Sequence, residues 1–384
     1  MIYTHVYIGI QEDINKEEEK MTFARRGLQG LQQRLPRLDH KKMGTRFNNS
    51  FNNSFNTKPS FNTRGGSKRL KLAVLDWSGT VSDIFSNAPN YGFVKLFANH
   101  GLPISMNEAR GPMGKSKLPH VKDICSIPRV ANLIFEKNKK LLLEKRNGIK
   151  ISTSKMATII TPESIYNDYV ETQIQVLEKH PEFLNIIPGA LKTFDTLRNQ
   201  LGMKIGLTTG FPKSISDKFE QAAKKQGLLV DKCLASDQVI EGRPSAEGMW
   251  KLMDDIPETR FEISAKNNVP EKNIFTVKVD DTKNGIGEGI NSGSWTVGVY
   301  ATSSYMGIDS VKDYRNLKPK ELEERLNYSK NELQSYSSSS SSPLGGCVDF
   351  LIPYIGDLPA ICNMINYRLS RGLIPGQLPT ETSF

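Results

Sequence analysis

Short apolar runs that alternate with helical patterns are the feature that most constrains how this chain folds. Leu72-Ala73-Val74-Leu75 ends directly at Asp76, as a buried parallel strand would. Three similar runs and a weaker fourth one follow, at residues 204–208, 274–279, 295–300 and 348–352. Helical patterns cover residues 189–199 and 214–226. This alternation predicts an α/β protein with a doubly wound parallel sheet.

The segment between the first and second strands is too long for one crossover and is helical in character. Phe93, Val94 and Phe97 form one apolar helix face. Ser105 and Glu108 have capping-box spacing. A further segment, Thr161-Pro162, predicts the start of a helix that continues past Tyr169 to Leu177. We therefore predict an inserted helical cap domain over the carboxyl edge of the sheet, where such folds bind ligands.

The 384 residues, 38% of them hydrophobic, suit roughly two domains. We predict a core domain formed by residues 68–83 and 188–384, and a cap domain formed by residues 84–187. Residues 1–67 contain low-complexity sequence that cannot bury much apolar surface, so we predict a disordered basic tail. The serine run within residues 337–346 predicts a flexible insertion in the core domain.

Much of the net charge of +10 lies in the N-terminal stretch, where Asp39 is the one acidic residue between Met21 and Lys71. A disordered tail explains this, and a mitochondrial transit peptide is the alternative if translation begins at Met21. We therefore expect a cytoplasmic or mitochondrial protein. The four cysteines form no CxxC pair and favour a reducing compartment. We expect neither a nucleic-acid nor a membrane partner, because nothing folded presents the tail and no apolar stretch spans a bilayer.

Four polar segments follow one another in the order that marks a known superfamily. They are Asp76-Trp77-Ser78-Gly79-Thr80, Thr208-Thr209-Gly210-Phe211, Glu241-Gly242-Arg243-Pro244 and Val279-Asp280-Asp281-Thr282. Taken singly, each is compatible with ordinary turn chemistry. Together they resemble the motifs of the haloacid dehalogenase (HAD) superfamily, which implies a HAD-like Rossmannoid core.

Within that superfamily, the chain resembles the phosphonoacetaldehyde hydrolases. The cap run Pro112-Met113-Gly114-Lys115-Ser116-Lys117-Leu118-Pro119-His120 is similar to their cap motif, and Gly-Arg-Pro replaces the superfamily's usual lysine segment. Gly287-Glu288-Gly289 and residues 294–298 also read like this family. The resemblance covers roughly residues 70–369 and says nothing about the tail.

The resemblance implies that Asp76 is the nucleophile that attacks phosphorus, since a carboxylate forms an acyl phosphate that water hydrolyses. Superfamily phosphatases and mutases usually have a second aspartate two residues later, which protonates the leaving ester oxygen. This chain has Ser78 there. A phosphonate has no ester oxygen, so the missing acid fits carbon–phosphorus cleavage, although it also fits a damaged phosphatase.

By the same resemblance, Lys117 forms a Schiff base with the substrate aldehyde and His120 transfers protons during that step. A helix start near Ser116 and the neighbouring Lys115 would both lower the pKa of Lys117. Met113 and Gly114 would line the pocket, with core packing as the alternative for Met113. An isolated lysine is more often a solvated surface residue, so the motif around it carries this interpretation.

The remaining motifs are expected to hold the phosphoryl group and a metal ion. Thr209 and the Gly210 amide would bind the phosphoryl oxygens together with Arg243. Phe211 stands where the family usually has tyrosine, and Gly285 stands where some members have a further aspartate.

The expected metal is Mg²⁺, which prefers oxygen ligands. Asp76, the Ser78 carbonyl and Asp281 would bind it, with Asp280 as a helper. A pair of acidic turn residues is the alternative reading of the two adjacent aspartates.

The sequence thus predicts a Mg²⁺-dependent enzyme of phosphonate degradation that hydrolyses phosphonoacetaldehyde to acetaldehyde and phosphate. The resemblance also implies a homodimer formed through the cap. Two alternatives stay open: a HAD phosphatase or mutase acting on a phosphate ester, and a non-catalytic scaffold with the same fold.

Overall fold

The computed structural model describes residues 69–146, 159–256, 271–335 and 347–376. In these ranges six strands form one sheet in the order β3-β2-β1-β4-β5-β6, and every neighbouring pair is parallel. The strands are β1 (Leu72–Leu75), β2 (Lys204–Thr208), β3 (Lys232–Leu234), β4 (Thr276–Asp280), β5 (Trp295–Val299) and β6 (Phe350–Ile352).

The parallel sheet predicted from the apolar runs is confirmed, with one strand missed. The runs at residues 204–208, 274–279, 295–300 and 348–352 correspond to β2, β4, β5 and β6. Strand β3 has only three residues, two of them incompletely buried, so it produces no apolar run.

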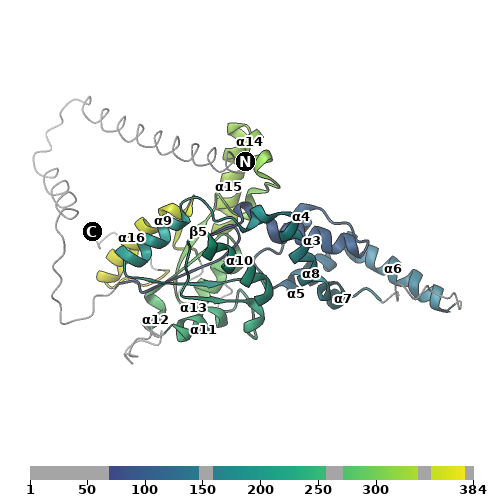
Figure 1. Cartoon of the computed structure of the whole chain (residues 1–384), viewed down its shortest axis with the longest axis horizontal. Helices are drawn as coiled ribbons and strands as arrows, with labels where there is room; N and C mark the ends of the chain where they lie inside the picture. The colour runs from purple at the N-terminus through teal and green to yellow at the C-terminus, as the bar shows by residue number, and fades with distance from the viewer. Residues whose placement is uncertain (1–68, 147–158, 257–270, 336–346, 377–384) are drawn as a thin grey trace, which may run out of the picture. The chain divides into compact units, whose positions relative to one another are not determined.

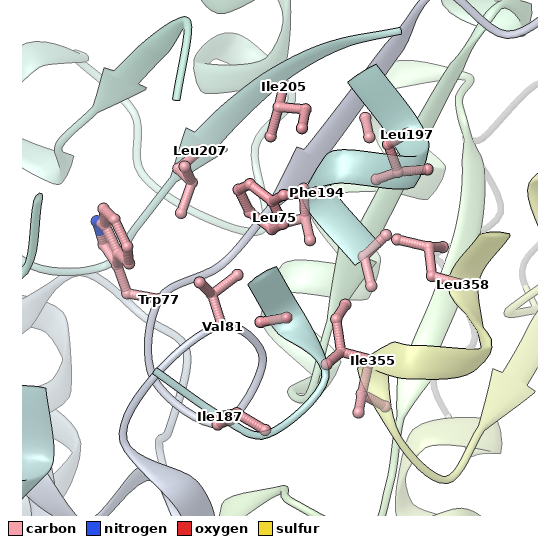
Figure 2. Packing of buried hydrophobic residues seen from close by; sticks show 14 of the residues in the cluster. Leu75, Trp77, Val81, Ile187, Phe194, Leu197, Ile205, Leu207, Ile355 and Leu358 are labelled. Carbon is pink, nitrogen blue, oxygen red and sulfur yellow. The ribbon is translucent and has the colours of Figure 1, made fainter. Parts of the chain in front are cut away.

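Both faces of the sheet are buried, as the continuous apolar character of the strands requires. Along β1, Ala73 and Leu75 point into one hydrophobic cluster, while Leu72 and Val74 point into another on the opposite face. Figure 2 shows part of the larger cluster, in which Leu75 lies near the side chains of α9 and the segment after it.

Helices cover each face of the sheet (Figure 1). The larger cluster includes side chains of α9 (Ala190–Asp195), α10 (Lys213–Lys225) and α16 (Leu358–Ser370). Helices α11 (Glu247–Asp255) and α13 (Lys283–Ser292) cover the other face. The predicted helical segments at residues 189–199 and 214–226 are therefore confirmed, with the first one continuing as a π-helical turn over Thr196–Gln200.

The cap between β1 and β2 is helical, as predicted, and has a hydrophobic cluster of its own. Phe93, Phe97 and Tyr169 belong to this cluster, together with Val121 and Ile165. Its helices are α3 (Asn87–Asn99), α4 (Met106–Arg110), α5 (Lys117–Ser126), α6 (Pro128–Arg146), α7 (Pro162–Asn167) and α8 (Tyr169–Lys179).

The cap helices begin where the sequence predicts, but one of them is divided. Ser105 and Glu108 form a capping box at α4, and Thr161 caps α7. The single helix expected beyond Thr161 is wrong, because α7 ends and α8 begins on either side of Asp168, whose ψ is 0°. The Asp168 carboxylate lies 3.0 Å from His100 Nε2, and this tertiary contact accompanies the break.

The remaining described elements are three helices and several short turns. They are the helices α12 (Glu271–Ile274), α14 (Val311–Asn316) and α15 (Pro319–Gln334) and the short turns η1 (Ile84–Ser86), η2 (Pro181–Leu184), η4 (Ser236–Gln238), η6 (Ser304–Met306) and η7 (Ile355–Asp357). The predicted tail and the predicted serine-rich insertion lie outside the described residues. Among the helices of the described ranges, none combines the length and apolar character needed to cross a membrane.

Candidate active site

The site lies where the order of the strands reverses, at the carboxyl ends of the central strands. Leu75 of β1 pairs with Leu207 of β2 on one side and with Val279 of β4 on the other. Asp76 directly follows β1. It therefore lies at the carboxyl edge of the sheet, between the ends of β2 and β4. Open α/β sheets bind their ligands at this kind of position.

Three buried aspartates meet at this edge. Carboxylate oxygens of Asp76, Asp280 and Asp281 all lie within 4.8 Å of one another. Burial raises the pKa of Asp76 to about 6. Burial, with Asp280 and Asp76 as negative neighbours, also raises the pKa of Asp281 well above its ordinary value. The raised pKa values mean that the surroundings disfavour the simultaneous negative charge of these carboxylates.

The aspartates differ in how far the protein already neutralises them. Lys278 Nζ lies 3.2 Å and Arg243 Nη1 lies 3.4 Å from Asp280 Oδ2, while Thr282 donates two hydrogen bonds to Oδ1. Burial alone would raise the pKa of Asp280, but the two cations and Thr282 lower it. Asp280 is therefore the least available of the three as a direct ligand of a cation.

Asp281, by contrast, accepts hydrogen bonds from neutral donors alone among the described residues. Ser86 Oγ donates to its Oδ2 at 2.9 Å, the Ser304 amide donates to the same oxygen at 3.3 Å, and Thr80 Oγ1 donates to Oδ1 at 3.4 Å. In the described part of the chain, Asp76 Oδ1 and Asp280 Oδ2 are buried and accept no hydrogen bond. Buried carboxylate oxygens with spare lone pairs fit a hard divalent cation such as Mg²⁺. Ser78, whose carbonyl is the third expected ligand beside Asp76 and Asp281, is buried in the turn after β1.

Arg243 reaches this cluster from the loop after β3. Its Nη1 lies 3.0 Å from Asp76 Oδ1, and the side chain is 4% exposed. The atoms are at ion-pair distance, although their angles are not those of a hydrogen bond. The expectation that Arg243 lies beside the Asp76 carboxylate therefore agrees with the geometry.

Two further buried charges, which the sequence interpretation missed, lie next to Arg243. Lys278 of β4 and Glu288 of α13 approach to 2.9 Å, and Arg243 Nε donates to Glu288 Oε2 at 3.0 Å. Lys278 is fully buried. The signal was a single lysine between two valines of a fully buried strand, a position that requires a charged partner.

Lys117, the first residue of α5, is 4% exposed and faces aromatic rings. Its Nζ lies 4.5 Å from the ring centroid of Phe211 and 5.7 Å from that of Phe93. Burial lowers the pKa of Lys117 to about 7, with Asp76 opposing this change and Arg243 adding to it. The lowered pKa was expected, and α5 begins after Ser116 as predicted. Burial, the largest cause, was not expected, and Lys115, whose ammonium pairs with Asp123 at 2.6 Å, is not among the main causes.

His120 lies one helical turn after Lys117 and is fully buried. Its ring stacks on Phe93 with the centroids 3.9 Å apart. Nε2 lies 2.8 Å from the Ala109 carbonyl, which can only accept, so Nε2 carries the proton. Nδ1 is left with no partner in the described ranges. Burial, together with Lys117, holds the pKa of His120 well below its usual value, so the ring is neutral.

Two glycines of the core motifs let the cap loop approach closely. A Cβ atom on Gly210 would lie 2.6 Å from the Lys115 carbonyl oxygen, and one on Gly242 would lie 1.8 Å from Ser116 Oγ. A side chain at Gly210 would push away the backbone of the loop that carries Lys117, and one at Gly242 would displace the Ser116 side chain. Asp76 and Lys117 are close enough for each to shift the pKa of the other.

The other expected substrate-binding residues lie on the same two surfaces. Met113 is buried, and its carbonyl accepts a hydrogen bond from Asn284 Nδ2 at 2.7 Å. Gly114 has a φ of +87°, a left-handed conformation that glycine adopts without strain. Thr209 is buried, and its Oγ1 accepts a hydrogen bond from the Phe211 amide.

The space between these surfaces is small. The cavity lined by Ser116, Thr209 and Arg243 has a volume of about 10 Å³, which is room for about one water molecule. A larger cavity of about 850 Å³ lies between α4 and α15 and is lined by none of the expected site residues. A substrate therefore reaches the site only if the cap and the core separate.

Comparisons with known proteins identify relatives over most of the chain. A curated "Phosphonoacetaldehyde hydrolase" of Pseudomonas paraeruginosa is 31% identical over 311 residues, which are 80% of this chain and 96% of that protein. A protein of the same name from Pseudomonas putida is 32% identical over 311 residues, with the same coverage of 80% and 96%. No family model matches the chain.

A solved structure agrees with this similarity. The "phosphonoacetaldehyde hydrolase like protein" from Oleispira antarctica superimposes with a TM-score of 0.63 and 26% identity, covering 80% of this chain and 97% of that one. These relatives come from bacteria, so their similarity gives no support to the mitochondrial alternative.

Proposed function

Because this chain belongs to the phosphonoacetaldehyde hydrolase family of the HAD superfamily, we propose that it hydrolyses phosphonoacetaldehyde to acetaldehyde and phosphate. One observation carries the proposal beyond family membership. A buried lysine whose pKa is about 7 lies within electrostatic reach of a buried aspartate at the ligand edge of the sheet. Cleavage of a carbon–phosphorus bond needs both groups, whereas cleavage of a phosphate ester has no use for the lysine.

Lys117 provides the electron sink in this proposal. At neutral pH about half of a population with a pKa near 7 is uncharged, and only the uncharged amine attacks the aldehyde carbonyl. Loss of water gives an imine, which is protonated to an iminium ion. His120 supports these proton transfers, since Nδ1 is a buried acceptor without a partner among the described residues.

Asp76 then attacks phosphorus. A bond forms between its carboxylate oxygen and phosphorus, and the carbon–phosphorus bond breaks. The electron pair of that bond flows into the iminium ion and gives an enamine. Protonation and hydrolysis of the enamine release acetaldehyde from Lys117, and water hydrolyses the aspartyl phosphate. Arg243, Thr209 and the Gly210 amide hold the phosphoryl oxygens during this transfer.

Mg²⁺ is the cofactor that we propose for the acidic cluster. Asp76, Asp281 and the Ser78 carbonyl would bind it, with Asp280 as the helper, because Asp280 already has cationic partners. When bound, Mg²⁺ supplies positive charge that offsets the repulsion between the phosphoryl oxygens and the attacking carboxylate. The raised pKa values of Asp76 and Asp281 and the unused buried oxygens support this assignment.

The assembly and the domain boundaries are also part of the proposal. We propose a homodimer formed through the cap, with residues 84–187 as the cap domain, residues 68–83 and 188–384 as the core domain, and a cytoplasmic location. Helix α6 of the cap exposes Phe135, Leu142 and Leu143, and apolar side chains on a surface favour association.

A product assay tests the proposed function. The protein is incubated with Mg²⁺ and phosphonoacetaldehyde, and acetaldehyde and phosphate are measured separately. We expect the two products in equal amounts, and no comparable phosphate release from glycolaldehyde phosphate, an ester that keeps the aldehyde. Rapid release from the ester that survives Lys117→Ala would favour an ordinary phosphatase. A folded, Mg²⁺-loaded protein without turnover of either compound would favour a scaffold.

A further inference from the structure

Lys278 and Glu288 form a buried ion pair to which the proposed reaction assigns no role. Lys278 is 0% exposed and Glu288 is 2% exposed. We propose that these two residues are positioning residues, which hold the Arg243 guanidinium so that one edge of it faces the phosphoryl group. This inference rests on the proposed function for the identity of the bound group, a tetrahedral phosphorus oxyanion.

The contacts of Arg243 divide its guanidinium into a held part and a presented part. Nε donates to Glu288 Oε2 at 3.0 Å, and Nη2 donates to Thr208 Oγ1 at 2.8 Å and to the Thr208 carbonyl. Only Nη1 faces the aspartates, at 3.0 Å from Asp76 and 3.4 Å from Asp280. Since the guanidinium is planar and rigid, fixing Nε and Nη2 also fixes the direction of Nη1.

Lys278 contacts the same two side chains, Thr208 and Glu288, that accept hydrogen bonds from Arg243. Its Nζ lies 2.6 Å from Thr208 Oγ1, 2.9 Å from Glu288 Oε2 and 3.2 Å from Asp280 Oδ2. The first contact is a hydrogen bond that Nζ donates, and the other two are ion pairs. They connect the ends of β2 and β4 with α13. Because none of its surface is exposed, Lys278 cannot contact a ligand, so its effect on a substrate must pass through Arg243 and Asp280.

The charges around Arg243 explain why Lys278 and Glu288 are not replaced by apolar residues. Two cations, Lys278 and Arg243, lie among four carboxylates, those of Asp76, Asp280, Asp281 and Glu288, so a net negative charge remains at the ligand edge. A buried ion pair of this kind is often no more stable than apolar residues of the same volume. The neighbouring side chains Leu72 and Val74 of β1, on this face of the sheet, are apolar. We therefore infer that the ion pair orients the Arg243 guanidinium, and that this orientation offsets the free-energy cost of burying two charges.

The test measures phosphate binding, because inorganic phosphate needs Arg243 but not Lys117. Glu288→Gln keeps the shape of the side chain, but its neutral amide oxygen has to replace a carboxylate oxygen that accepts hydrogen bonds from Arg243 and Thr208 and forms an ion pair with Lys278. We expect the Kd of phosphate, measured by calorimetry with Mg²⁺, to rise about tenfold, or about 1.4 kcal/mol. The KM for phosphonoacetaldehyde should rise in parallel. Imine formation between Lys117 and acetaldehyde should not change.

A double variant separates positioning from mere stability. Removing one partner of a buried pair destabilises a protein, whereas replacing both partners is often nearly neutral. We therefore expect Lys278→Met combined with Glu288→Gln to recover most of the Tm lost in either single variant, while the phosphate Kd stays about tenfold weaker. A Kd that returns to the wild-type value together with Tm would overturn the proposal, as would an unchanged Kd in the folded Glu288→Gln variant.

Asp349→Asn provides the matched control. Asp349 accepts hydrogen bonds from the amide and hydroxyl of Thr296 near the amino end of β5, at the opposite edge of the sheet from the site. This variant should lower Tm and leave the phosphate Kd unchanged.

Phosphate binding also separates this inference from the proposed function. A protein that binds phosphate and responds to Glu288→Gln, but never cleaves phosphonoacetaldehyde, keeps the positioning role and loses the reaction. A wild-type protein that binds no phosphate in the presence of Mg²⁺ contradicts the positioning role.

Discussion

The two halves of the candidate site handle charge in opposite ways. Around Lys117 in the cap, the protein provides two aromatic rings and, within the described ranges, no hydrogen bond or ion pair. Around Asp76 in the core, it provides Arg243 and the buried charges behind it. An amine becomes reactive when the protein gives it no hydrogen-bond or ion-pair partner. A site for a phosphorus oxyanion, by contrast, needs such partners.

The size of the effect on the amine shows why burial matters. A lysine with an ordinary pKa of 10.5 would be only ~0.03% uncharged at pH 7. With its pKa lowered to about 7, roughly half of Lys117 is uncharged, a gain of about 10³-fold in reactive amine. The core half needs no such change, because Arg243 acts in its charged form.

Replacing the Lys117 amine should have the largest effect on activity and should distinguish the cap half of the site most clearly from the core half. Lys117→Met keeps the length and apolar character of the side chain but cannot form an imine. We expect the cleavage of phosphonoacetaldehyde to fall by about 10⁴-fold or more, since a covalent catalyst is lost. The phosphate Kd should stay within about twofold of wild type. Substantial residual cleavage would contradict the role of Lys117.

The reciprocal change is Arg243→Lys, which keeps a positive charge and loses the planar fork. We expect kcat/KM to fall by about 10²- to 10³-fold, as when a preorganised donor is removed from a developing charge. Phosphate binding should weaken as well, whereas acetaldehyde should still form an imine at Lys117 at the wild-type rate. Loss of imine formation in this variant would show that the halves are not independent.

The proposed Mg²⁺ site lies in the core half alone. Asp281→Asn removes one negative charge from the cluster, and we expect the Mg²⁺ concentration for half-maximal activity to rise about 10- to 100-fold. Chelation of Mg²⁺ should abolish turnover but leave imine formation intact. A matched change at the better-compensated Asp280, Asp280→Asn, should shift the Mg²⁺ requirement less. An equal or larger shift at Asp280 would reverse the proposed assignment of ligand and helper.

The smallest expected effect concerns the pH dependence of the cap half. Because Lys117 must lose a proton to react, and its pKa is about 7, imine formation with acetaldehyde should slow tenfold per unit below about pH 7 and level off above it. Phe211→Leu keeps water out but removes the ring that attracts the ammonium form. The midpoint should move to lower pH, by roughly half a unit to one unit. A midpoint that moves to higher pH would show that the ring acts by excluding water.

Much of the fold was predictable because the strands carry their own signal. Leu72–Leu75 reads as a buried parallel strand, and the same reasoning located β2, β4, β5 and β6. Strand β3 was missed because three residues are too few for a pattern. The break at Asp168 was missed because the contact with His100 that accompanies it joins residues far apart in the sequence.

The candidate site was predictable to the extent that it follows from topology. Parallel strands bring their carboxyl ends together, so Asp76, Thr209 and Asp281 had to meet. Lys278 and Glu288 were missed because their roles depend on distances between separate elements. The cause of the low pKa of Lys117 was missed for the same reason, since burial by Phe93 and Phe211 exists only in the folded chain.

Borohydride reduction in the presence of phosphonoacetaldehyde tests the central claim most directly. Borohydride converts an imine into a stable secondary amine, and peptide mass spectrometry then locates it. We predict inactivation by a single adduct on Lys117, with none on the neighbouring Lys115, whose ammonium is paired with Asp123. Active protein without an adduct, or an adduct confined to other lysines, would contradict the account.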